Sequence, residues 1–86
     1  MTVGILGLGL IGGSLARAYA KSGHEVYAID RDDSILSFAQ LADVVHGRLD
    51  AETIGSCELI LLSIYADASA SWLEENAVYV SKDALV

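Results

Sequence analysis

The stretch VGILGLGLIGGSLARAY, residues 3–19, decides the fold, because an apolar run leads directly into three spaced glycines and then a helical pattern. Thr2 to Leu6 is a short apolar segment, typical of a buried parallel strand. From Leu10 to Ser22 the apolar residues recur at three- and four-residue steps, which predicts a helix. Gly23 stands where the C-cap of that helix is expected. The segment therefore predicts a strand, a tight turn and a helix.

Gly7, Gly9 and Gly12 match the pattern G-x-G-x-x-G. In this pattern the first glycine permits the tight turn, the second lets a phosphate approach the backbone, and the third lets the helix lie close to the sheet. The backbone amides of Leu10 and Ile11 are then free at a helix N-terminus, where the helix dipole favours an anion. We predict that this loop binds the pyrophosphate of a dinucleotide, the alternative being a purely structural turn.

An acid follows the next expected strand, Val26–Ile29. This acid, Asp30, lies 18 residues after Gly12 (30 − 12), close to the offset of about 20 at which an acid binds ribose hydroxyls. A carboxylate repels a 2′-phosphate and accepts a hydrogen bond from a free 2′-hydroxyl, so NAD is predicted in preference to NADP. Arg31 could instead bind that phosphate or stack on the adenine, and the alternative is a solvated loop charge.

Strands and helices continue to alternate towards the C-terminus. The expected elements are a helix from Asp32 or Asp33, a strand at Val44–Val45, a weak helical turn at Ala51–Ser56, a strand at Leu59–Ile64, a helix at about Asp67–Val80 and the start of a fifth strand at Ala84–Val86. In the first of these helices, Ile35, Leu36 and Ala39 are expected to be buried. This alternation predicts an α/β fold: a Rossmann-type doubly wound parallel sheet of about four to five strands, truncated, with helices on both faces.

Ser63, Ile64 and Tyr65 come at the C-terminal end of the most apolar strand. Ligands of open α/β sheets bind outside the carboxyl ends of the strands. We therefore expect these three residues to border the ribose and nicotinamide side of the cofactor. The alternatives are that Ser63 only caps the strand and that Tyr65 packs on the following helix.

Composition restricts the kinds of partner. The 86 residues suffice for one domain, residues 1–86, and carry five basic and twelve acidic side chains, a net charge of −7. This charge opposes binding to nucleic acid or an anionic membrane, so a phosphate ligand must rely on backbone amides.

No apolar run is long enough for a membrane helix. His24 and His46 have no partner at metal-ligand spacing, so no metal site is expected. With Cys57 as the single cysteine and no basic leader segment, a cytoplasmic protein is expected.

Three segments resemble the N-terminal domain of the prephenate and arogenate dehydrogenases. GLGLIGGSLA, residues 7–16, is the most specific of them, GHEVYAIDRD spans residues 23–32, and ELILLSIYADAS spans residues 58–69, with Tyr65 where a proline is usual. The resemblance implies an oxidoreductase that decarboxylates prephenate or arogenate oxidatively, with hydride transfer to NAD or NADP, in tyrosine biosynthesis. The cofactor contacts that it implies are Gly7, Gly9, Leu10, Ile11, Gly12, Asp30 and Ser63.

In that family, the catalytic histidine and the helical domain for dimerisation and substrate binding would lie beyond Val86. No catalytic residue is therefore assigned, and the chain alone is expected to be inactive, because hydride transfer needs cofactor and substrate in contact. The exposed edge of a truncated sheet predicts a homo-oligomer.

Two alternatives remain open. One is the cofactor domain of a hydroxyacid or 6-phosphogluconate type of dehydrogenase, against which the run Gly12-Gly13-Ser14 argues. The other is a regulatory domain that senses NAD or NADH without turnover.

Overall fold

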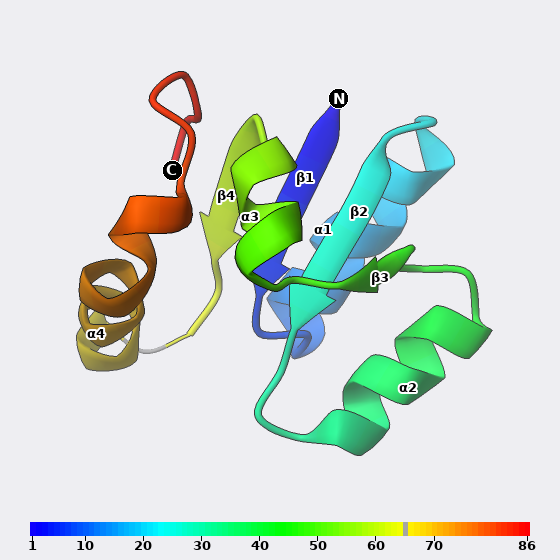
Figure 1. The fold of residues 1–86 in the computed structure, drawn as a ribbon. Coiled ribbons are helices and arrows are strands. Elements are labelled where there is room, and N and C mark those ends of the chain that lie inside the picture. Colours follow the sequence, from blue (N-terminus) through cyan, green and yellow to red (C-terminus); the bar gives the residue numbers. More distant parts are fainter. Residues whose placement is uncertain (65) are drawn as a thin grey trace.

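A computed structural model gives the fold of the chain (Figure 1). It describes residues 1–64 and 66–86, and for Leu10, Ile11, Asp33 and residues 66–68 it describes the backbone alone. Tyr65, which is predicted to border the cofactor, lies outside the described residues.

Strands and helices alternate along the chain, as predicted. In order they are β1 (Thr2–Leu6), α1 (Leu10–Lys21), β2 (Glu25–Ile29), α2 (Asp33–Leu41), β3 (Gly47–Arg48), α3 (Ala51–Ser56), β4 (Leu59–Leu62), α4 (Ala66–Asn76) and the 3-10 helix η1 (Ala77–Tyr79). The described residues form a four-stranded parallel sheet in the order β3-β2-β1-β4. The chain runs outward from β1 to β3 and returns to the other side of β1 as β4, so the doubly wound arrangement is confirmed.

The sheet separates two apolar cores, and successive residues of β1 point into one or the other. The core on the side of α1 and α2 contains Val3, Ile5, Leu8, Ala16, Val26, Ala28, Leu36, Ala39 and Val45. The core on the side of α3 contains Leu6, Leu49, Ile54, Cys57 and Ile60. Figure 1 shows α1 behind the strands and α3 in front of them, so helices cover both faces.

Aspartates begin two of the helices. Asp32 is the N-cap of α2, and its carboxylate accepts the backbone N–H of Ser34 at 2.9 Å. Asp50 forms a capping box with Thr53 at the start of α3. Such caps satisfy N–H groups that have no partner within the helix. They explain why α2 begins at Asp33, as predicted, and why the weak turn at Ala51–Ser56 is a helix.

The third strand differs from the prediction, since β3 is Gly47–Arg48 rather than Val44–Val45. The backbone N–H groups of both valines donate to the carbonyl oxygen of Ala39 (2.9 and 3.4 Å), near the end of α2. The backbone of these valines therefore satisfies a carbonyl group near the C-terminus of α2 instead of pairing with β2.

Three further details of the prediction are wrong. Ile35 is 41% exposed, whereas Leu36 and Ala39 of the same helix are buried in the core. β4 ends at Leu62, two residues before the expected Ile64. α4 ends at Asn76, where the Asn76 side-chain amide donates to the Trp72 carbonyl oxygen at 3.0 Å and the chain tightens into η1.

A further strand begins beyond β4, as expected. Leu85 forms an isolated parallel bridge with Leu59. The Leu85 N–H donates to the Glu58 carbonyl oxygen at 2.9 Å, and the Ile60 N–H donates to the Leu85 carbonyl oxygen at 2.8 Å. The outer side of β4 is thus paired near its start.

Candidate functional site

The turn that leaves β1 requires glycine at position 7. Gly7 has a φ of +87°, in the left-handed region that side chains disfavour. Its N–H donates to the Ile29 carbonyl oxygen at 2.8 Å, which ties the turn to the end of β2. A Cβ atom here would lie 2.7 Å from both Ile64 Cγ2 and the Ser63 carbonyl oxygen. The end of β4 therefore packs directly against this turn.

Gly12 lies where α1 crosses the same turn. A Cβ atom on Gly12 would overlap the Gly7 carbonyl oxygen and would lie 2.5 Å from Ser63 Oγ. Because no side chain fits, the first turn of α1 rests on the turn and on the end of β4. This is the close helix approach that the third glycine of the motif predicts.

Gly9 is the open position of the loop. It is the N-cap residue of α1, no side chain caps the helix there, and the described first turn contains no acidic residue. A Cβ atom on Gly9 would meet nothing within 4 Å. The space beside Gly9, at the start of α1, is thus open to an anion, and the helix dipole favours its negative charge. These features fit the pyrophosphate of a dinucleotide.

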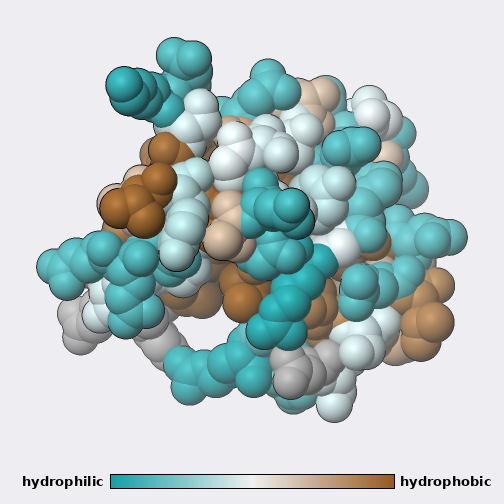
Figure 2. Space-filling model, in the orientation of Figure 1, coloured by the Kyte–Doolittle hydropathy of each residue, from teal (hydrophilic) through white to brown (hydrophobic). Residues whose placement is uncertain are grey.

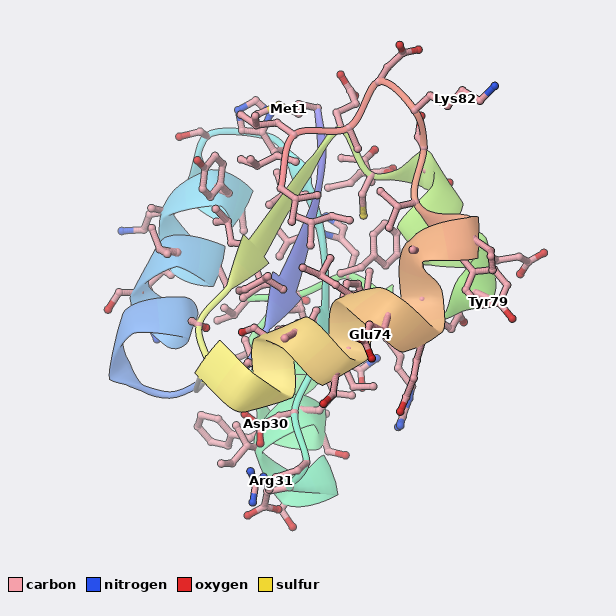
Figure 3. All side chains as sticks on the ribbon, turned by 90° about the vertical axis from the view of Figure 1, so that its left-hand side faces the viewer. Met1, Asp30, Arg31, Glu74, Tyr79 and Lys82 are labelled. Atoms are coloured by element: carbon pink, nitrogen blue, oxygen red, sulfur yellow. The ribbon has the colours of Figure 1, made fainter. Side chains whose placement is uncertain are left out.

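Asp30 lies beside the loop, at the end of β2 (Figure 3). Its Oδ2 atom accepts the backbone N–H of Leu8 at 2.7 Å, and its Oδ1 atom accepts the N–H of Asp32 at 3.0 Å. Each carboxylate oxygen has a second acceptor position, so the group can still accept hydrogen bonds from ribose hydroxyls. The sequence pattern predicts the position of the acid, but it does not predict the hydrogen bond from the Leu8 N–H.

Ser63 holds the loop from the side of β4. Its N–H donates to the Leu6 carbonyl oxygen at 2.9 Å. Its hydroxyl lies within donating distance of two carbonyl oxygens, that of Leu6 (2.7 Å) and that of Gly7 (2.6 Å). The hydroxyl hydrogen is therefore directed into the loop.

The structure brings most of the predicted site residues together. Those that surround the start of α1 are Gly7, Gly9, the backbone of Leu10 and Ile11, Gly12, Asp30, Ser63 and Ile64. Arg31 is exposed, and its side chain points away from the sheet (Figure 3).

No group of histidine, cysteine and acidic residues that could hold a metal occurs among the described residues. Within residues 1–64 and 66–86, no helix is long and apolar enough to cross a membrane. Cys57 is buried, and this burial raises the pKa of its thiol to about 11, so it remains protonated at neutral pH.

An apolar patch lies on the outer face of α2. Ile35, Phe38 and Leu41 are 41%, 72% and 85% exposed, and Figure 2 shows hydrophobic surface on that side of the molecule. These residues are three positions apart, and residues at that spacing lie on the same face of a helix. Two residues of this patch, Ile35 and Phe38, also line the groove that runs from Leu8 and Gly9 between α1 and α2.

Comparison with solved structures places the fold among dehydrogenases and reductases. Arogenate dehydrogenase from Synechocystis is 28% identical, with a TM-score of 0.88, over 98% of this chain and 31% of that one. An imine reductase from Streptomyces aurantiacus is 31% identical, with a TM-score of 0.75, over 92% of this chain and 28% of that one.

Prephenate dehydrogenase from A. aeolicus, in complex with hydroxyphenyl propionate and NAD+, shares the fold at 22% identity, with a TM-score of 0.82, over 98% of this chain and 31% of that one. The chain thus spans about a third of the length of these proteins. No curated protein sequence matches the chain.

The family model described as "NADP oxidoreductase coenzyme F420-dependent" matches residues 2–86. The match includes the glycine loop, the acid at the end of β2 and the end of β4. The fold and this match agree with the resemblance seen in the sequence. The chain belongs to this oxidoreductase family and has the fold of the NAD(P)-binding domain of arogenate and prephenate dehydrogenases.

Proposed function

We propose that this chain binds NAD as the cofactor module of a dehydrogenase that acts on prephenate or arogenate. The observation that carries the proposal is the open start of α1 at Gly9 with the Asp30 carboxylate beside it. The amides would bind the pyrophosphate, and the carboxylate would accept hydrogen bonds from the adenosine ribose. Bound NAD supplies the acceptor for a hydride from the substrate.

The preference for NAD over NADP rests on charge. A 2′-phosphate would bring negative charge next to the Asp30 carboxylate, which already accepts two backbone N–H groups and is thereby held in place. Arg31 is the nearest basic residue in the sequence, but its side chain is exposed and points away from the sheet (Figure 3). The free 2′-hydroxyl of NAD can instead donate to this carboxylate.

The substrate assignment rests on the relatives. Arogenate and prephenate dehydrogenases share the fold over 98% of this chain. Ser63 and Ile64, at the end of β4, border the side on which the ribose and nicotinamide would lie, and Tyr65 follows them in the sequence. Residues that act on the substrate would belong to the remaining two thirds of a protein of that length, so this chain alone would be inactive.

Calorimetric titration with NAD and with NADP tests the cofactor proposal. NAD should bind more tightly than NADP. Asp30→Asn removes the charge but keeps one acceptor oxygen, so NAD should bind about tenfold more weakly, the loss of a charged hydrogen bond. In the same variant, the preference for NAD over NADP should shrink.

Asp83→Asn is the matched control, because Asp83 is exposed and lies outside the loop. It should bind both nucleotides as the unsubstituted chain does. Equal NAD affinity in Asp30→Asn and Asp83→Asn would contradict the role of Asp30. A folded chain that binds neither nucleotide would contradict the proposed function as a whole.

We also propose that the chain is cytoplasmic. We further propose that it self-associates at the outer side of β4. Among the described residues, only the bridge of Leu85 with Leu59 pairs this side of the strand. Unpaired strand edges invite pairing with another chain. Sedimentation velocity over a range of concentrations should show a shift to a larger species. A single monomeric species at every concentration would contradict this association.

A further inference from the structure

Ser63 is set apart from the other residues of the site by the direction of its hydroxyl. A serine that served the cofactor directly would present this group to the open side of the loop. Here the hydroxyl is directed to the carbonyl oxygens of Leu6 and Gly7, at 2.7 and 2.6 Å. Both acceptors belong to the turn between β1 and α1.

The carbonyl oxygens differ in what else they bind. That of Leu6 also accepts the Ser63 N–H, at 2.9 Å, so it keeps a partner if the hydroxyl is removed. The Gly7 carbonyl oxygen lies under Gly12, and Ser63 Oγ lies 2.5 Å from the position of a Gly12 Cβ atom. The hydroxyl thus reaches the point at which the turn, the start of α1 and the end of β4 meet.

We propose that Ser63 is a positioning residue, whose hydroxyl fixes the glycine loop against the end of β4 and so holds the backbone amides of α1 ready for the nucleotide. This role rests on the proposed nucleotide site. Because the loop is also tied to β2, through the Asp30 carboxylate and the Leu8 N–H, removal of one hydroxyl loosens the loop without releasing it. The nucleotide then has to order the loop when it binds.

The test compares Ser63→Ala, Ser63→Cys and Ser71→Ala. Alanine removes the hydroxyl and adds no bulk, cysteine leaves a weaker donor, and Ser71 is an exposed serine of α4. Amide hydrogen exchange of the nucleotide-free chain reports on the loop through the N–H groups of Gly7 and Leu8. The Leu49 N–H, which donates to the Ala28 carbonyl oxygen at 2.8 Å, serves as the internal reference.

In Ser63→Ala the Gly7 and Leu8 amides should exchange about five- to tenfold faster, the equivalent of one lost hydrogen bond. Leu49 should be unchanged, and Ser63→Cys should also exchange faster than the unsubstituted chain, because its larger sulfur cannot keep the 2.6 and 2.7 Å contacts of the hydroxyl. A role in packing alone predicts no faster exchange in Ser63→Ala, because alanine fits wherever serine does. Equal loop exchange in Ser63→Ala and Ser71→Ala would overturn the inference.

Titration with NAD completes the test. The affinity of the Ser63 variants should fall in the same order as their loop protection. Weaker binding without any change in loop exchange would overturn the positioning role and would point to a direct contact with the cofactor. If the unsubstituted chain does not bind NAD, the proposed function fails, while the exchange data still decide whether Ser63 holds the loop.

Discussion

The carboxylate of Asp30 accepts the backbone N–H of Leu8 at 2.7 Å, although 22 positions separate the two residues in the sequence. This bond joins the end of β2 to the glycine loop, and the Gly7 N–H, which donates to the Ile29 carbonyl oxygen, joins the same two segments. The acid that would recognise the ribose is thus also hydrogen-bonded to the glycine loop. Its substitution must change the loop as well as the binding of the nucleotide.

Asp30→Ala is therefore expected to lower the stability of the nucleotide-free chain. The substitution leaves the half-buried Leu8 N–H without its acceptor, which costs about 1–3 kcal/mol. Urea denaturation followed by circular dichroism measures the free energy of unfolding, with Asp83→Ala as the exposed control. An unchanged midpoint in Asp30→Ala would show that the bond to Leu8 contributes nothing to the fold.

Gly12→Ala and Gly9→Ala should separate folding from binding. The Cβ atom of Gly12→Ala overlaps the Gly7 carbonyl oxygen, so α1 must move and stability should fall by about 1–3 kcal/mol or more. Gly9→Ala meets no atom within 4 Å, so the chain should fold normally. Its methyl group would nevertheless occupy the space above the amides of α1, and NAD affinity should fall.

Gly13→Ala is the matched control for both variants. Gly13 lies within α1, and a Cβ atom there would lie 3.4 Å from the Leu8 carbonyl oxygen, an ordinary contact. Alanine at a helical position should raise stability by about 0.5–1 kcal/mol. Thermal unfolding of the three variants gives the comparison, and a Gly12→Ala chain as stable as Gly13→Ala would contradict the close approach of α1 to the turn.

The sequence predicted those parts of the fold that depend on local pattern. β1 was predicted with its observed bounds, Thr2–Leu6, because its apolar run ends in the glycine turn. For the contacts of Gly12, Asp30 and Ser63 with the turn at Gly7 and Leu8, the sequence predicts only that these residues lie close together. Its hydrogen bonds join segments far apart in the chain, and no periodicity encodes them.

Other elements show where local pattern gives the wrong answer. Val44 and Val45 have the apolar character of a strand, but their N–H groups are used to close α2. α4 contains neither proline nor glycine to stop it, and at its end the Asn76 side chain donates to the Trp72 carbonyl oxygen. In both places the structure contains specific hydrogen bonds that the hydrophobic pattern does not report.

The capping box of α3 should make stability depend on pH in the acid range. The hydrogen bonds that Asp50 accepts, first of all from the Thr53 backbone N–H, hold the pKa of its carboxyl below the ordinary 3.8. A lowered pKa in the folded chain means that the carboxylate stabilises the fold above about pH 4. This contribution is lost as the pH falls through the pKa of the folded state.

Asp50→Ser isolates this effect, because serine caps a helix without a charge that titrates. The stability difference between the unsubstituted chain and Asp50→Ser should be largest near pH 6 and should shrink below pH 4. Urea denaturation at several pH values measures it. A difference that stays constant from pH 6 to pH 3 would show that the charge of Asp50 has no part in the cap.

Cys57 should behave as an inert core residue in the folded chain. Its side chain is 1% exposed, its Sγ atom lies 3.2 Å from the Thr53 carbonyl oxygen, and burial raises its pKa from 9.0 to about 11. Thiol reagents attack the thiolate and need access to it. At pH 8 an aromatic disulfide reagent should therefore label the native chain far more slowly than the chain in denaturant, and equal rates would contradict the burial.

The same raised pKa should also make the chain less stable at alkaline pH. The unfolded chain releases the thiol proton near pH 9, whereas the folded chain retains it until about pH 11. Folding stability is therefore lost as the pH rises from 9 to 11, because the unfolded state binds fewer protons there. Cys57→Ala has no proton to release, so its stability relative to that of the unsubstituted chain should improve over this range, and parallel curves for the two chains would contradict the shift.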